Sequence, residues 1–185
     1  MVLDYGLQPM PDPLQAEGEA GFTLVVSNAG RQAVTCSAIV VSLPVGEAAK
    51  DLIAATEGIE THVPPGWNVS QEGGDFTLTP AGGDGAIGPD GLAFIFTAMR
   101  VNAQPGTANI VVTEHAAPQS GPAQADSAVY PVGKFPPSFA LGELSASRAE
   151  VVSPGETTLM WVGSDDPACA YVLEYEPADD GVRVR

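Results

Sequence analysis

Apolar and polar residues alternate along several short stretches of this chain. From Phe22 to Ser27 every second residue is Phe, Leu or Val, the period of a β-strand with one buried face. Asn28 and Gly30 then supply turn formers. A second apolar run, 34–43, follows the turn. Because two strands are unstable alone, we expect these runs to form a hairpin that the rest of the chain covers.

The second apolar run changes phase. Its first part, 34–36, places apolar residues at even positions, whereas its second part, 39–43, places them at odd positions. A shift of one residue would move the later side chains to the wrong face of the sheet. We therefore predict a β-bulge near Ser37 and Ala38. Pro44 cannot donate a hydrogen bond to a neighbouring strand and ends this one.

Turn-forming residues separate further short alternating segments. We predict strands at 3–7, 67–70, 76–79, 92–98, 107–114 and 127–132. The segment 47–54 instead contains good helix formers, with Gly58 beyond its end, and predicts a helix of about two turns. The pattern predicts an all-β sandwich with one short helical insertion over residues 1–133.

The segment from Phe22 to Gly46 also carries an ordered motif. An apolar strand is followed by Asn28-Ala29-Gly30, a second apolar strand and Leu43-Pro44-Val45-Gly46. This order resembles the immunoglobulin-like repeats of bacterial surface proteins, in which a strand, Asn-x-Gly, a strand and Leu-Pro-x-Gly recur. The resemblance implies an immunoglobulin-like sandwich over 1–133 that acts as a spacer or adhesive module. It carries over no catalytic residues.

Residues 134–185 are predicted to form a second unit, which begins at the Pro-rich junction 134–138. Its apolar segments lie at 139–152, 157–161 and 170–175. They resemble the first three strands of a fibronectin type III module. That family's strand-two Trp and strand-three Tyr residues are matched by Trp161, Tyr171 and Tyr175. The resemblance implies that Trp161 packs in the core between two sheets.

The second unit is too short to be a complete module of this kind. Residues 134–185 number 52, whereas a seven-stranded sandwich needs about 100. Either the chain is a fragment of a longer protein, or the unit is completed by the first domain, by a second copy or by a partner strand. We favour a fragment, or packing on the first domain, over strand exchange.

The chain is strongly acidic, with 23 Asp and Glu against 7 Lys and Arg and a net charge of −16. A nucleic-acid or anionic-membrane partner is disfavoured, because both require basic patches. No apolar run approaches the ~20 residues of a membrane helix, so we expect no membrane insertion. Residues 1–15 do not resemble a secretory signal. The default location is cytoplasmic, or the cell surface or exterior if a leader has been removed.

Candidate chemistry is sparse. The Gly-rich loop 81–91 contains Asp84 and Asp90, and Asp75 is nearby in sequence; carboxylates of this kind are ligands for Ca²⁺. Their spacing is not that of an EF-hand, and a plain pair of turns is the interpretation we favour. Cys36 shares the buried parity of its strand and is predicted to be a small buried residue, with a disulfide to Cys169 disfavoured. No other cofactor is expected.

We therefore expect a non-catalytic β-sandwich module for interaction or scaffolding. It would act through edge strands and an apolar patch around Trp161, Tyr171 and Tyr175, with a protein partner or a second copy. The alternative is an exported bacterial adhesin or stalk module that binds carbohydrate or calcium through its loops. A small hydrolase is a remote third, because the sequence has no Gly-x-Ser-x-Gly elbow and neither His62 nor His115 has a second ligand at metal spacing.

Overall fold

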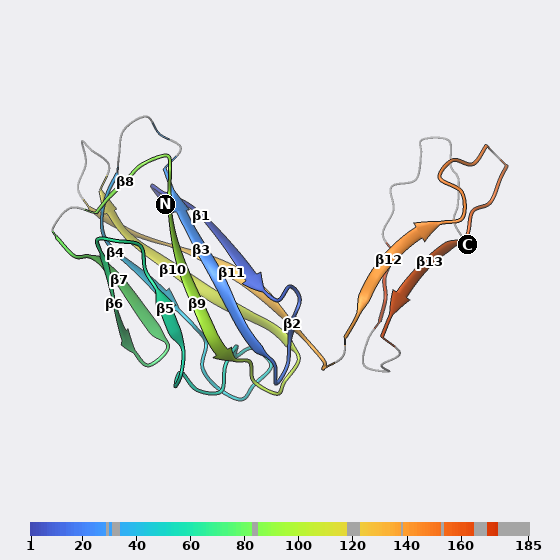
Figure 1. Cartoon of the computed structure of the whole chain (residues 1–185), viewed down its shortest axis with the longest axis horizontal. Coiled ribbons are helices and arrows are strands. Elements are labelled where there is room, and N and C mark those ends of the chain that lie inside the picture. Colours follow the sequence, from blue (N-terminus) through green and yellow to red (C-terminus); the bar gives the residue numbers. More distant parts are fainter. Residues whose placement is uncertain are drawn as a thin grey trace. The chain divides into compact units, whose positions relative to one another are not determined.

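The structure is a computed structural model of the whole chain. It describes residues 1–28, 30, 34–82, 85–117, 123–137, 139–152, 154–164 and 170–173. The chain divides into two compact units, Met1–Pro137 and Ser138–Arg185 (Figure 1). The described residues form strands, turns and loops without a helix, and so contain no helix long and apolar enough to cross a membrane. The predicted all-β fold is confirmed.

The first unit consists of two sheets. Its strands are β1 (Asp4–Met10), β2 (Leu14–Gln15), β3 (Glu19–Ser27), β4 (Val34–Ser42), β5 (Glu60–His62), β6 (Trp67–Glu72), β7 (Asp75–Pro80), β8 (Gly85–Ile87), β9 (Leu92–Arg100), β10 (Gly106–Ala117) and β11 (Gln124–Phe135). One sheet has the order β1-β3-β9-β5 and the other β2-β11-β10-β4-β7-β6, with β8 also beside β4. Neighbouring strands are antiparallel except β2 and β11.

Aromatic side chains join the two sheets across the core. Phe76 of β7 meets Phe96 of β9 edge to face, with ring centroids 5.4 Å apart. Trp67 of β6 meets Phe94 of β9 in the same way at 5.2 Å. Such pairs add to the free energy gained by burying the rings. The first unit is therefore a β-sandwich.

The predicted hairpin between β3 and β4 is wrong, because the two strands belong to different sheets. Asn28, which is buried, lies where the chain crosses between the sheets. Its backbone N–H donates to Gly88 O at 3.3 Å, and its side-chain amide donates to Ile87 O at 3.4 Å. These bonds tie the crossing to the last residue of β8 and to the residue that follows it. Because of this crossing, the apolar faces of the two strands lie opposite each other across the core. In a hairpin they would lie side by side on the same sheet.

The predicted β-bulge in β4 is confirmed. His115 of β10 pairs with Ala38 and Ala116 pairs with Cys36, which leaves Ser37 as the extra residue. Cys36 and Ile39 are consequently both fully buried, although they differ in parity. The bulge resets the register as the phase change in the sequence requires.

The predicted helix at 47–54 is wrong. The chain instead makes a turn in which Asp51 N–H donates to Ala48 O at 2.9 Å. It then enters the core at Leu52 and Ile53, both fully buried. Ile53 forms single bridges to Val45 and to Val101. Packing at the end of the sandwich outweighs the local preference for helix.

A second bulge joins β3 to β9. Ala20 pairs with Met99 and Phe22 pairs with Phe96, so Gly21 faces both Thr97 and Ala98. Ala98 has a φ of 56°, a left-handed conformation that is uncommon for residues other than glycine. A Cβ atom on Gly21 would lie 2.5 Å from the carbonyl oxygen of Phe96.

The described part of the second unit is a two-stranded antiparallel sheet. It consists of β12 (Leu141–Ala146) and β13 (Leu159–Gly163). All six residues of β12 are exposed. The predicted burial of Trp161 in a core between sheets is not observed, since this side chain is 49% exposed. The strands described in this unit form one sheet, and no second sheet among them covers the indole ring.

We predict that Gly21→Ala lowers the free energy of unfolding by about 1–3 kcal/mol, because the added methyl group meets a backbone oxygen that cannot move freely. Gly6→Ala, in the neighbouring strand with nothing within 4 Å of the added atom, should change it by less than about 0.5 kcal/mol. Urea unfolding of the full chain measures both variants. Equal effects would contradict the close contact at the bulge.

Candidate functional site

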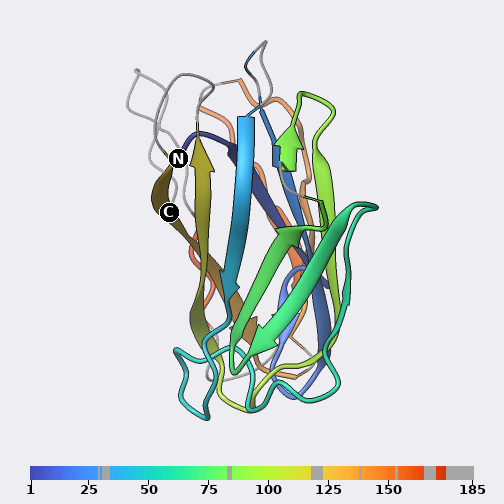
Figure 2. The ribbon, with the colours of Figure 1, turned by 90° about the vertical axis from the view of Figure 1, so that its left-hand side faces the viewer.

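The most accessible strand edge in the first unit belongs to β6, the last strand of the larger sheet. One side of β6 pairs with β7 in an unbroken register from Trp67–Pro80 to Glu72–Asp75. Its other side pairs with no strand that the structure describes (Figure 2). Five of its six residues are exposed. Backbone N–H and C=O groups on such an edge are available to another strand.

β6 is held firmly although it lies at an edge. Its first residue, Trp67, is only 8% exposed and packs against Phe94. The two-residue turn Gly73-Gly74 joins its other end to β7. Leu43 N–H donates to the carbonyl oxygen of Gly74 at 2.9 Å, which ties this turn to the end of β4. Both ends of the edge are thus fixed before any partner binds.

The other ends of the two sheets in the first unit are blunted in the ways that natural proteins use against unwanted pairing. β1 contains Asp4 and Pro9, β5 has three residues and β2 has two. By contrast, Trp67 to Gln71 of β6 contain no charged residue and no proline. The register of β6 with β7 contains no bulge. Among the ends of the two sheets in the first unit, β6 is the edge that is best suited to accept a strand.

Val69 is the apolar residue at the middle of this edge. It pairs with Leu78, so both side chains lie on the face of the sheet that looks toward the core. Leu78 is fully buried, whereas Val69 remains 37% exposed. A strand added beside β6 would cover part of this apolar surface.

An uncharged band crosses the outer face of the same sheet and ends at β6. One residue from each of five strands lies at the same level, in the order Ser127, Thr113, Val40, Thr77 and Ser70. The hydroxyl oxygens of Thr113 and Ser127 are 2.8 Å apart. On a chain of net charge −16, this band brings a neutral surface up to the open edge.

The buried polar groups of Asn102 and Lys134 serve the fold. The Asn102 side-chain amide donates to Gly46 O, Ala48 O and Asp51 O at 2.9, 3.0 and 2.9 Å. Its oxygen accepts from Lys134 Nζ at 2.6 Å, and Lys134 also donates to Asp51 O. Burial lowers the pKa of Lys134, an effect that the nearby Asp51 opposes. These contacts satisfy the carbonyl groups of the loop that was predicted to be helical.

The carboxylate of Glu114 is likewise buried and structural. Its oxygens accept from the backbone N–H groups of Val2 and Leu3, the second at 3.2 Å. Glu114 therefore fastens the segment before β1 to the opposite sheet. The neighbouring Tyr5 hydroxyl is buried and has no hydrogen-bond partner among the described residues. Burial and then the charge of Glu114 raise the pKa of Tyr5.

Sequence reasoning missed Asn102 and Glu114 and placed Lys134 in a linker. Lys134 lies in β11 and is 2% exposed, so the first unit includes it. One signal was present: Lys134 and Glu114 have the same strand parity as the apolar residues Val132 and Val112. A charged residue at a core position requires a partner.

The structure separates the aspartates of the predicted calcium site. Asp75 pairs with Ser42 at one end of β4, whereas β8, which precedes Asp90, pairs with the other end at Val34 to Cys36. Val34 and Ser42 are eight steps apart along the strand, which is about 26 Å. Asp75 thus does not share a site with Asp90, which is exposed in a turn. Asp84 lies outside the described residues, so calcium binding by the loop stays a prediction.

The predicted interaction residues of the second unit are described only in part. Trp161 lies in β13, and the Tyr171 hydroxyl donates to Ser164 O at 2.8 Å. Tyr171 is 37% exposed. Tyr175 lies outside the described residues. An interaction patch formed by these three residues stays a prediction.

The structure places the two histidines of the chain apart, and the lack of catalysis stays a prediction. His62 lies in β5 and His115 in β10, in different sheets. In the described part of the chain, no three His, Cys, Asp or Glu side chains gather closely enough to hold a metal ion.

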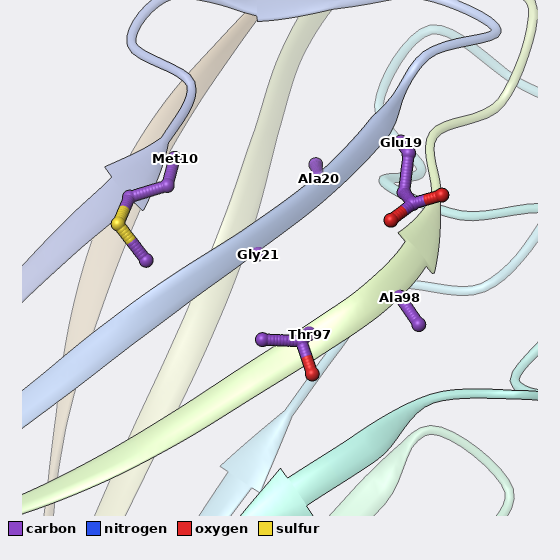
Figure 3. Close-up of a pocket in the computed structure, with 6 residues that line it drawn as sticks. All are labelled: Met10, Glu19, Ala20, Gly21, Thr97 and Ala98. Atoms are coloured by element: carbon purple, nitrogen blue, oxygen red, sulfur yellow. The ribbon is translucent and has the colours of Figure 1, made fainter.

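A surface depression lies at the bulge between β3 and β9. It is lined by Met10, Glu19, Ala20, Gly21, Thr97 and Ala98 (Figure 3). Glu19 and Thr97 are the lining residues with polar side chains. One carboxylate and one hydroxyl do not make a nucleophile, base and oxyanion site.

Comparisons with known proteins find resemblance in solved structures alone. No family model and no curated protein matches the chain. An uncharacterized protein from Nocardia farcinica with an immunoglobulin-like fold is 13% identical, over 69% of this chain and 97% of that one, with a TM-score of 0.46. The BcpA*(D312A) major pilin subunit of Bacillus cereus is 10% identical, over 85% of this chain and 52% of that one, also at 0.46. The chain thus spans about half of the pilin subunit, and this similarity transfers no function.

We predict that Asn102→Ala lowers the free energy of unfolding by about 2 kcal/mol, because the carbonyl of Gly46 loses its donor, those of Ala48 and Asp51 each lose one of two donors, and the Lys134 ammonium loses one of its two acceptors. Asn109→Ala, on the exposed side of β10, is the matched control and should change it by less than about 0.5 kcal/mol. Urea unfolding monitored by Trp fluorescence compares them. A loss below about 0.5 kcal/mol in Asn102→Ala would show that the loop after β4 keeps its conformation without the hydrogen bonds from Asn102.

Cys36 gives the fold a defined response to alkaline pH. Its thiol is fully buried, and burial raises its pKa from 9.0 to about 11. The thiolate is therefore favoured in the unfolded chain. The stability due to this group is complete below pH 9 and is lost as pH rises through about 11.

Between pH 8 and 10.5, the wild-type chain should lose about 2 kcal/mol more stability than Cys36→Ala does. The variant is the control for tyrosine ionisation, which both chains share. Urea unfolding at the two pH values gives the difference. An equal loss in both chains would contradict the raised pKa of Cys36.

Proposed function

We propose that this chain is a non-catalytic, immunoglobulin-like β-sandwich module for protein interaction or scaffolding, which acts by pairing the open edge of β6 with a strand of another protein. The observation that carries this proposal is the edge itself. β6 is regular, uncharged from Trp67 to Gln71 and fixed at both ends. In strand addition, main-chain hydrogen bonds supply the affinity and alternate side chains supply the specificity.

The chemistry of the described polar groups supports the same conclusion. Asn28, Asn102, Glu114 and Lys134 are buried, and each has a structural partner within the fold. They position loops and strand ends instead of presenting reactive groups. Among the described residues of the first unit, we therefore assign function to the strand edge with the neutral band beside it.

A fluorescein-labelled peptide with the sequence of residues 66–73 is a suitable probe, because it is an uncharged alternating strand up to its single glutamate. We expect it to bind the full chain saturably in fluorescence anisotropy. Val69→Lys should weaken binding by about tenfold or more, because an inward-pointing lysine blocks pairing at a sheet edge.

Val25→Lys is the matched control for this experiment. Val25 is 44% exposed, close to the value for Val69. It lies in β3, whose two sides are occupied by β1 and β9. Its replacement should leave peptide affinity within about twofold of wild type. Equal weakening by both substitutions, or no binding to the wild type up to about 1 mM peptide, would refute pairing at β6.

A further inference from the structure

We infer that the strand that pairs with β6 is β6 of a second copy of this chain, related by a two-fold axis that passes through Val69 perpendicular to the sheet. This inference rests on the proposed function, since it requires the edge to accept a strand. It adds the identity of the partner and the register of the pairing.

Charge is the first argument for a second copy. Two chains of net charge −16 repel one another, and like charges directly opposite across strands are destabilising. β6 offers five successive residues, Trp67 to Gln71, without a charge. The neutral band that ends at Ser70 extends this uncharged surface over the neighbouring strands. Two copies can therefore pair from Trp67 to Gln71 without bringing a charged residue of one strand opposite a charged residue of the other.

Symmetry limits the register. A two-fold axis perpendicular to the sheet keeps the core-facing sides of both copies on one side, so that a residue faces a residue of the same parity. With Val69 opposite its own copy, Asn68 faces Ser70 and Trp67 faces Gln71. Glu72 then lies opposite Gly66, which precedes the strand. No acidic residue faces another.

The side chains in this register suit one another on both faces of the joined sheet. On the core-facing side, the two Val69 side chains, each 37% exposed in the single chain, bury apolar surface together. On the outer side, Asn68 and Ser70 can exchange hydrogen bonds. The uncharged band of one sheet then continues into that of the other.

The alternative register, centred on Ser70, suits the edge less well. It places Asn68 opposite Glu72 and Val69 opposite Gln71, so that an apolar residue faces an amide. Because only about five residues pair in either register, the interface is small and the dimer should be reversible.

Disulfide trapping tests the register directly. Opposite residues of an antiparallel pair have Cα atoms about 4.5–5.5 Å apart, within reach of a disulfide. In a full chain that carries Cys169→Ser, with Cys36 buried, Val69→Cys should form a covalent dimer under mild oxidation. Ser70→Cys, two residues out of register with its own copy, and Val25→Cys should form at least about tenfold less.

Light scattering of the wild-type chain at two concentrations completes the experiment. A dimer fraction that rises with concentration and is lost in Val69→Lys supports the inference. A monomer at both concentrations, a dimer that persists in Val69→Lys, or trapping of Val69→Cys no greater than that of Val25→Cys overturns it. If the 66–73 peptide still binds in that case, the edge accepts a strand, and the proposed function stands without self-association of the full chain. If the peptide also fails, the proposed function falls as well.

Discussion

The contacts of Phe94 and Phe96 with rings of the opposite sheet set the spacing of the sandwich, and the placement of β6 depends on them. Trp67 begins β6 and meets Phe94 across the core, while Phe76 of the neighbouring strand meets Phe96. An edge strand fixed in this way loses little further freedom on binding, so that less of the interaction free energy is spent on ordering it. The same aromatic packing that stabilises the fold thus prepares its open edge.

Hydrogen bonds from two buried polar side chains stabilise the loop at the end of the sandwich. The loop after β4 inserts Leu52 and Ile53 into the end of the sandwich, and the carbonyl groups of Gly46 and Asp51 take their donors from outside the loop. Asn102 and Lys134, from the segments after β9 and near the end of β11, supply the missing donors. A buried carbonyl without a partner is costly, so these two side chains make an irregular loop compatible with a tightly packed end.

Much of the strand content could be predicted from the sequence, because alternation is a local signal. The same reasoning located the bulge at Ser37, since a change of phase within one strand has few other physical solutions. Local signals could not decide which sheet each strand joins, and the turn at Asn28 therefore suggested a hairpin. The helix predicted at 47–54 failed for a related reason: Asn102, about fifty residues away, provides hydrogen bonds that no local propensity contains. The open edge of β6 could not be predicted either, because it depends on the order of the strands in the sheet, which local sequence patterns do not contain.

Acidity and the neutral edge act together in this chain. A net charge of −16 keeps molecules apart over most of their surface, and the other ends of the two sheets in the first unit are short or carry a charge and a proline. Repulsion of this kind discriminates among contacts without removing all of them. It disfavours any arrangement that brings acidic groups face to face and leaves the stretch from Trp67 to Gln71 comparatively accessible. For an interaction module, general repulsion combined with a neutral strand edge gives specificity even where the paired strand is short.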